Sequence, residues 1–167
     1  MTELVFTNRY ATHPDDVRGY DTEQLRQHFL LDNLMQADSL VLNYTHYERL
    51  IVGSAVPTTQ PLFLPTVDAL KAEYFLERRE LGIINVGADG VVVVDDVTYP
   101  LANKEALYVG RGAKAVWFHS INPEQPAKFY LNSTPAHRAY PHTHITMAQC
   151  NVLHMGALET SNHRDIY

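Results

Sequence analysis

The block Glu77-Arg78-Arg79-Glu80 concentrates the charged chemistry of this sequence. If the block forms a β-strand, Glu77 and Arg79 share one face, while Arg78 and Glu80 share the other. A guanidinium can bind a carboxylate through two parallel hydrogen bonds, which suits an acidic substrate. Arg78, Arg79 and Glu80 are therefore candidates for substrate binding. Ion pairs between strands, domains or subunits are the more common role of such blocks.

The segment His142-Thr143-His144, followed by Gln149, is a second candidate site. Two histidines separated by one strand residue point to the same side, where both can ligate a divalent ion. Gln149 offers a neutral amide oxygen where zinc prefers a charged ligand, and Pro141 cannot donate to a central ladder. We therefore expect a surface loop with two histidines. His154 and His163 could supplement a metal site there.

The other reactive residue types form no catalytic pattern. His46, His119 and His137 lack carboxylate neighbours at triad-like spacing, which favours structural roles for these histidines. No serine lies in a strained elbow motif, and Cys150 has no evident activating base. The catalytic residues therefore stay unassigned.

Composition limits the partners of the chain. Its 167 residues include 13 basic and 19 acidic residues, and the formal charge of -6 provides no positive field for nucleic acid. The single cysteine cannot form an internal disulfide, and residues 1–8 lack the features of a secretory signal. No apolar run approaches the roughly 20 residues that span a bilayer. These features predict a cytoplasmic protein with no nucleic-acid or membrane partner.

The periodicity of the chain predicts mostly short strands. Residues 13–16 suggest a loop, Asp21 suggests a helix cap, and residues 22–34 suggest one amphipathic helix. Three prolines make residues 56–65 a loop or edge segment. The predicted strands are 40–44, 49–52, 73–77, 81–86, 91–95, 97–101, 106–109, 115–120 and 127–131. Many short strands with little helix predict an all-β sandwich or barrel.

Several longer segments occur in an order that is similar to a known family. These segments are 49–53 (RLIVG), 74–87 (YFLERRELGIINVG), 106–114 (ALYVGRGAK), 126–130 (PAKFY), 135–141 (PAHRAYP) and 160–162 (TSN). Together they resemble the N-terminal part of the 5-keto-4-deoxyuronate isomerase (4-deoxy-L-threo-5-hexosulose-uronate ketol-isomerase) family. The resemblance implies a cupin-like double-stranded β-helix with a short N-terminal helix and an irregular C-terminal tail.

The resemblance also implies that this part of the family lacks the metal site. In the metal-bearing second domain of the family, a His-x-His pair precedes a similar charged block. Here Tyr74 and Leu76 stand at those two positions, and Lys114 and Ala115 follow the glycine turn where another histidine would fall. Zinc is thus implied for the full-length enzyme, and no cofactor is expected in this chain.

Three domain segments and three functions follow from these observations. We expect an N-terminal arm at 1–36, a cupin-like domain at 37–141, and a truncated connector at 142–167 leading toward a missing second cupin domain. The main hypothesis is the N-terminal domain of a ketol-isomerase, inactive alone, whose full-length form takes a sugar acid and forms a homo-oligomer. The alternatives are a non-catalytic oligomerisation module and an independent metal-dependent cupin enzyme that uses His142 and His144.

Overall fold

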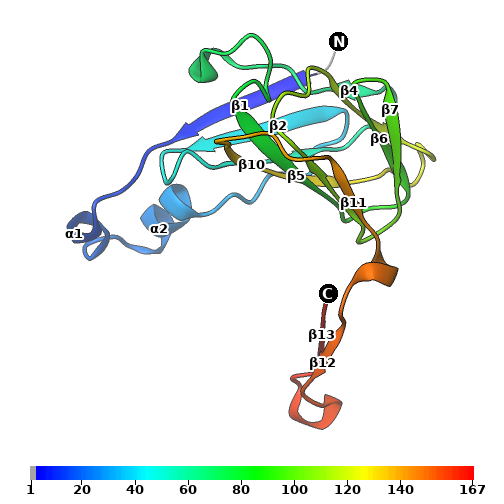
Figure 1. Ribbon diagram of the computed structural model, residues 1–167. Helices are drawn as coiled ribbons and strands as arrows, with labels where there is room; N and C mark the ends of the chain where they lie inside the picture. Colours follow the sequence, from blue (N-terminus) through cyan, green and yellow to red (C-terminus); the bar gives the residue numbers. More distant parts are fainter. Residues whose placement is uncertain (1–2) are drawn as a thin grey trace.

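Two β-sheets form the body of the protein in the computed structural model, which describes residues 3–167 (Figure 1). The larger sheet has the strand order β1 (Glu3–Arg9), β2 (Ser39–Thr45), β3 (Ile51–Ala55), β10 (Phe129–Pro135), β5 (Arg79–Asn85), β8 (Ala106–Val109) and β11 (Thr143–Ile145). The smaller sheet has the order β4 (Leu62–Phe63), β9 (Val116–Ser120), β6 (Gly90–Val94) and β7 (Val97–Leu101). The predicted all-β, cupin-like fold is confirmed.

Buried and partly exposed side chains alternate along the strands, so that one face of each sheet packs against the other sheet. In β6, Val92 and Val94 are buried, whereas Val91 and Val93 are only partly covered. The inner side chains of both sheets meet in one apolar core, where the rings of Phe118 and Phe129 lie 5.4 Å apart. Further core members are Leu42, Ile83, Leu101, Leu107 and Leu131. Apolar side chains therefore fill the space between the sheets.

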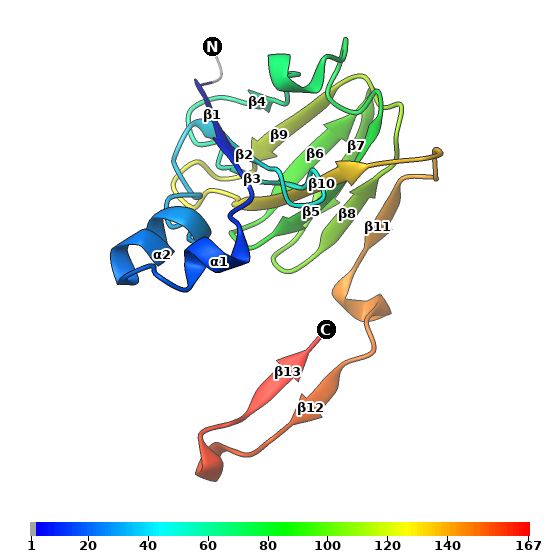
Figure 2. The same ribbon diagram turned by 90° about the vertical axis from the view of Figure 1, so that its left-hand side faces the viewer.

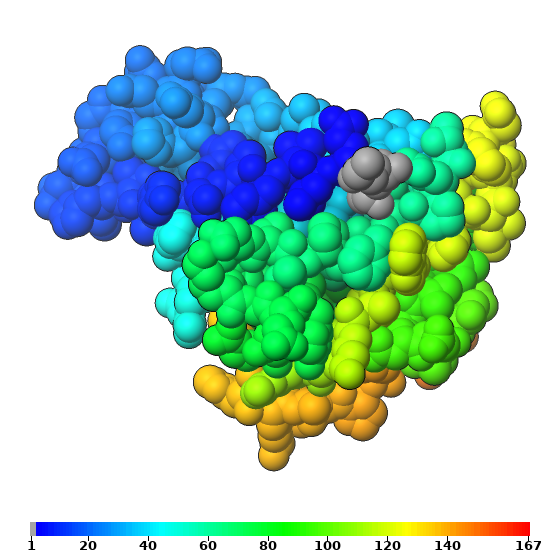
Figure 3. All heavy atoms as spheres, turned by 90° about the horizontal axis from the view of Figure 1, so that it is seen from above, coloured from blue at the N-terminus to red at the C-terminus, as the bar shows by residue number. Residues whose placement is uncertain are grey.

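The N-terminal segment adds a strand that the sequence analysis did not predict. Strand β1 pairs in parallel with β2, and Glu3 lies opposite Ser39. The chain then leaves the sheet through two helices, α1 (Pro14–Val17) and α2 (Thr22–Phe29), which extend beyond the sheets (blue in Figure 3). A capping box formed by Asp21 and Gln24 begins α2, so the predicted helix start is confirmed.

Three local predictions were wrong. The helix predicted over residues 22–34 ends at Phe29, because the backbone is already extended at Leu30. Residues 73–77 form turns, because the Glu73 amide donates to the Glu77 carboxylate at 2.7 Å and the Glu77 amide donates to the Tyr74 carbonyl. This turn places Phe75 in the core. Residues 13–16 were expected to form a loop, but Pro14 begins the single turn of α1, where its missing N–H costs no hydrogen bond.

The C-terminal segment ends in a hairpin of β12 (Leu153–Met155) and β13 (Arg164–Ile166), which extends away from the two sheets (Figure 2). The Tyr167 ring lies 5.0 Å from the Lys104 ammonium. Short 3-10 turns occur at Asp68–Leu70, Met147–Gln149 and Leu158–Thr160. Within residues 3–167, no helix is long and apolar enough to cross a membrane.

We expect Phe118→Ala to lower the free energy of unfolding by about 3–5 kcal/mol, because it removes a fully buried ring and leaves a cavity against Phe129. Urea denaturation provides the measurement. Val97→Ala serves as the control, since Val97 is exposed, and its effect should stay below about 1 kcal/mol. A loss below about 1 kcal/mol for Phe118→Ala would contradict the proposed core.

Candidate functional site

The interior of the sandwich does not fit a metal ion. Leu76, at one of the two positions where the resemblance places histidines, is buried in the apolar core, and Tyr74 is half-buried nearby in the sequence. Among residues 3–167, no three side chains of His, Cys, Asp or Glu are grouped so that they could hold a metal ion. Zinc needs nitrogen, sulfur or carboxylate ligands, which the apolar interior does not provide.

His142 and His144 lie at an edge strand, so the expected surface loop was wrong. Strand β11 pairs with β8 at the edge of the sheet, a position that tolerates Pro141 two residues before the strand begins. Both histidines are half-buried. The Gly110 amide donates to His142 Nδ1 at 3.0 Å, and His144 Nε2 lies 3.0 Å from Glu105 Oε2. These contacts attach the C-terminal segment to the sheet.

The other residues of that second candidate also have structural contacts. The amide of Thr146 donates to Gln149 Oε1 at 2.8 Å, which caps the 3-10 turn. His154 Nδ1 lies 2.6 Å from Asp165 Oδ1 across the terminal hairpin, and His163 lies 4.0 Å from the same oxygen. Gln149 and the hairpin histidines therefore do not join His142 and His144 at one site.

Arg79 is the most buried charged residue of the predicted site, with 5% of its surface exposed. Its Nε donates to Ser133 Oγ at 3.1 Å, and its Nη2 donates to the carbonyls of Ser133 and Arg49, both at 2.7 Å. Burial lowers the pKa of Arg79 to about 10; nearby Tyr44 opposes this effect, and the charge of Arg49 adds to it. Arg79 therefore stays charged at neutral pH.

Arg78 and Glu80 lie in different surroundings from Arg79. Arg78 precedes β5, is 55% exposed in its side chain, and donates to the carbonyls of Lys71 and Leu70. Its Nε lies 3.7 Å from the Glu77 carboxylate. Glu80 lies on the opposite face of β5 from Arg79 and is separate from the arginines.

Glu80 belongs to a polar cluster on the outer face of the large sheet. Tyr108 Oη donates to Glu80 Oε2 at 2.7 Å, and Thr134 Oγ1 donates to Glu80 Oε1 at 3.4 Å. Burial, together with the hydrogen bond to Glu80 and the charge of that carboxylate, raises the pKa of Tyr108 to about 12. The hydrogen bonds of Glu80 link β5 to β8 and β10, so the direct contacts of Glu80 are structural.

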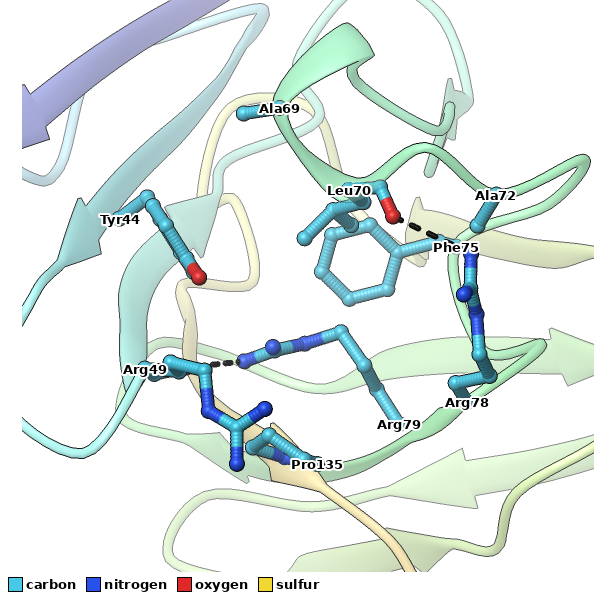
Figure 4. A pocket seen from close by; sticks show the side chains of 9 residues that line it. All are labelled: Tyr44, Arg49, Ala69, Leu70, Ala72, Phe75, Arg78, Arg79 and Pro135. Carbon is cyan, nitrogen blue, oxygen red and sulfur yellow. Dashed lines mark hydrogen bonds between the residues drawn. The ribbon is translucent and has the colours of Figure 1, made fainter.

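Arg78 and Arg79 line a pocket of about 160 Å³ that sequence reasoning did not predict (Figure 4). The tight turn before β3, in which Glu48 and Arg49 have positive φ values of 53° and 56°, brings Arg49 to the same pocket. The lining residues are Tyr44, Arg49, Ala69, Leu70, Ala72, Phe75, Arg78, Arg79 and Pro135. The clustering of three arginines without an acidic lining residue makes this pocket the candidate site.

The two sheets and their apolar interior define a cupin-like β-sandwich. The chain belongs to the KduI/IolB family, whose profile matches residues 34–167. It is 56% identical over 161 residues to the 4-deoxy-L-threo-5-hexosulose-uronate ketol-isomerase of Formosa agariphila. The aligned region covers 96% of this chain and 58% of that relative. The chain is 49% identical over 158 residues to the enzyme of the same name from Bacteroides fragilis, covering 95% of this chain and 56% of that relative. The chain thus spans little more than half the length of these curated relatives.

Two solved structures match part of this chain at low sequence identity. An IolB-like protein from Salmonella typhimurium matches with a TM-score of 0.49 and 15% identity, covering 70% of this chain and 41% of that chain. The Schizosaccharomyces pombe Cnp3 cupin domain matches with a TM-score of 0.47 and 12% identity, covering 65% of this chain and 73% of that chain.

We expect Glu80→Gln to lower the pKa of Tyr108 from about 12 toward its ordinary value, because the substitution removes the negative charge beside the phenol. NMR titration of the tyrosine ring measures this pKa. Glu77→Gln, which changes a carboxylate that does not contact Tyr108, should leave the pKa unchanged. An unchanged Tyr108 pKa in Glu80→Gln would contradict the contact.

The raised pKa also gives the sign of the alkaline pH dependence. The unfolded chain loses the Tyr108 proton at lower pH than the folded protein does. The contribution of Tyr108 to stability is therefore complete below the ordinary tyrosine pKa of about 10, and it is lost as the pH rises through about 12.

Proposed function

We propose that this chain is the N-terminal cupin domain of a 4-deoxy-L-threo-5-hexosulose-uronate ketol-isomerase. The proposed reaction of the whole protein interconverts 5-keto-4-deoxyuronate and 3-deoxy-2,5-hexodiulosonate in pectin and uronate degradation. The observation that carries this proposal is the 56% identity to the Formosa agariphila relative, whose name states the isomerase activity. We also propose a cytoplasmic location, consistent with a sugar-acid metabolic enzyme.

We further propose that this domain does not catalyse the isomerisation alone. Moving protons between neighbouring carbons requires a positioned acid and base, together with stabilisation of an enediolate. A zinc ion would supply that stabilisation in the whole protein. The apolar side chains between the sheets support the assignment of zinc ligands to a part of the protein outside residues 3–167.

An assembly role is a second candidate function, and it is compatible with the first. The terminal hairpin exposes apolar side chains, including Leu153, Met155 and Ile166, and the Leu158 side chain nearby is 79% exposed. Exposed apolar side chains on a projecting hairpin favour contacts with another protein surface. We therefore retain a homo-oligomer as the proposed assembly state.

The third hypothesis, a metal-dependent enzyme using His142 and His144, has less structural support. One nitrogen of His142 accepts a hydrogen bond from a backbone amide, and one nitrogen of His144 is within hydrogen-bond distance of the Glu105 carboxylate. Both histidines would have to change these contacts or use their other nitrogens to share a metal ion with further ligands.

The 167-residue chain should show no measurable isomerase activity on 5-keto-4-deoxyuronate in the presence of zinc, because its described residues provide no catalytic ligand set. A coupled turnover assay, run beside an intact family member, is the measurement. Turnover comparable to that of the intact enzyme would contradict the proposal. If such turnover and bound zinc were both lost in the double variant His142→Ala/His144→Ala, the independent enzyme would be the better explanation.

A further inference from the structure

The pocket at the start of β5 has an unusual charge balance. Arg49, Arg78 and Arg79 line it, and none of its lining residues is acidic. The chain as a whole carries 19 acidic and 13 basic residues, so the positive charge of this cluster is opposite in sign to the net charge of the chain. Charged groups removed from water are normally paired, because desolvation disfavours an isolated charge. The residues that line the pocket therefore provide no counter-charge for Arg49 or Arg79, whereas Arg78 has the Glu77 carboxylate nearby.

Arg79 leaves part of its guanidinium free at the base of this pocket. Three of its N–H groups donate to Ser133 Oγ, the Ser133 carbonyl and the Arg49 carbonyl, all of which are uncharged. Its Nη1 has no hydrogen-bond partner among residues 3–167. Every fully enclosed side-chain nitrogen or oxygen in that range has a partner, so Nη1 is at least partly open to solvent, and Arg79 is one of the residues that line the pocket.

The other two arginines are also available to an anion. Arg49 is another lining residue, and its guanidinium forms no hydrogen bond or ion pair with any residue in 3–167. Arg78 has one carboxylate contact in that range, with Glu77 at 3.7 Å, and both side chains are solvent-accessible. Figure 4 shows the Arg79 side chain crossing the pocket toward Arg49, with Tyr44 on one side and Arg78 on the other.

The rest of the lining indicates the kind of anion. Phe75 is 3% exposed, and with Leu70, Ala72 and Pro135 it forms an apolar wall. The Tyr44 hydroxyl adds one neutral polar group. The volume of about 160 Å³ lies below the roughly 300–1,000 Å³ of pockets for drug-sized ligands, which restricts the occupant to a small molecule.

We propose that this pocket binds the carboxylate of a small hydroxylated organic acid. The carboxylate accepts hydrogen bonds from Arg79 Nη1 and from Arg49, while the body of the acid packs against Phe75 and reaches the Tyr44 hydroxyl. Arg78 contributes charge from the rim. A partly apolar wall favours an organic acid over inorganic phosphate, and the deep position of Arg79 favours a small molecule over a protein side chain on a flat surface. This binding does not depend on isomerase activity.

NMR titration of the 167-residue chain with D-glucuronate tests the proposal, with D-glucose as the neutral sugar and inorganic phosphate as the non-organic anion. We expect saturable shifts of the Arg79 Nε–H and of the amides of Tyr44 and Phe75 with glucuronate, which weaken as sodium chloride is added. Glucose should produce no such shifts, and phosphate should bind more weakly than glucuronate.

Variants locate the binding without disturbing the fold. Arg49→Gln should weaken glucuronate binding about tenfold or more, because it removes a charged donor to the carboxylate. The fold should be kept, because the Arg49 side chain makes no hydrogen bond within residues 3–167. Arg18→Gln is the control with the same charge change, since Arg18 lies on the N-terminal arm, and it should bind normally. Arg79 is not substituted, because its three hydrogen bonds support the fold.

Three outcomes would overturn the proposal. These are the absence of saturable shifts with glucuronate, equal responses to glucose or phosphate, and equal weakening by Arg49→Gln and Arg18→Gln. The unchanged backbone spectrum of each variant excludes unfolding as the cause of lost binding. Since no turnover is measured, these outcomes are independent of the proposed isomerase function.

Discussion

The Arg79 guanidinium donates three hydrogen bonds to uncharged oxygens while 5% of the residue is exposed. These bonds connect the first residue of β5 to Ser133 in β10 and to the turn before β3. A charge this deeply buried needs acceptors for the donors that are enclosed, and the turn at Arg49 supplies one of them with its carbonyl. The neutral acceptors satisfy donors without cancelling the charge. The pocket beside Arg79 consequently remains positive, although the protein is acidic overall.

Much of the fold could be predicted because its strands alternate regularly. The predicted strands 97–101 and 106–109 have the bounds of β7 and β8. Strand β1 was not predicted, because its parallel partner β2 lies more than 30 residues away and local spacing carries no information about that pairing. At residues 73–77 a strand was predicted where the chain forms turns. A hydrogen-bonded turn can bury Phe75 as well as a strand can.

The candidate site was only partly predictable, because local spacing carries no information about contacts between distant segments. Alternation correctly separated Arg79 from Glu80. The pocket, however, joins the arginines of residues 78–79 to Tyr44 and Arg49, which approach through tertiary folding. The positive φ of Arg49, which presents its carbonyl to Arg79, leaves no pattern in the sequence because glycine is absent from that position.

The central claim, that the pocket carries an unbalanced positive charge, is tested most directly by building a carboxylate into it. Ala69 is an exposed lining residue, so Ala69→Glu and its uncharged isostere Ala69→Gln should both fold. Urea denaturation at low salt should show Ala69→Glu to be more stable than Ala69→Gln by about 0.5–1 kcal/mol. The difference should shrink as salt is added. Equal stability, or a less stable Ala69→Glu, would contradict the account.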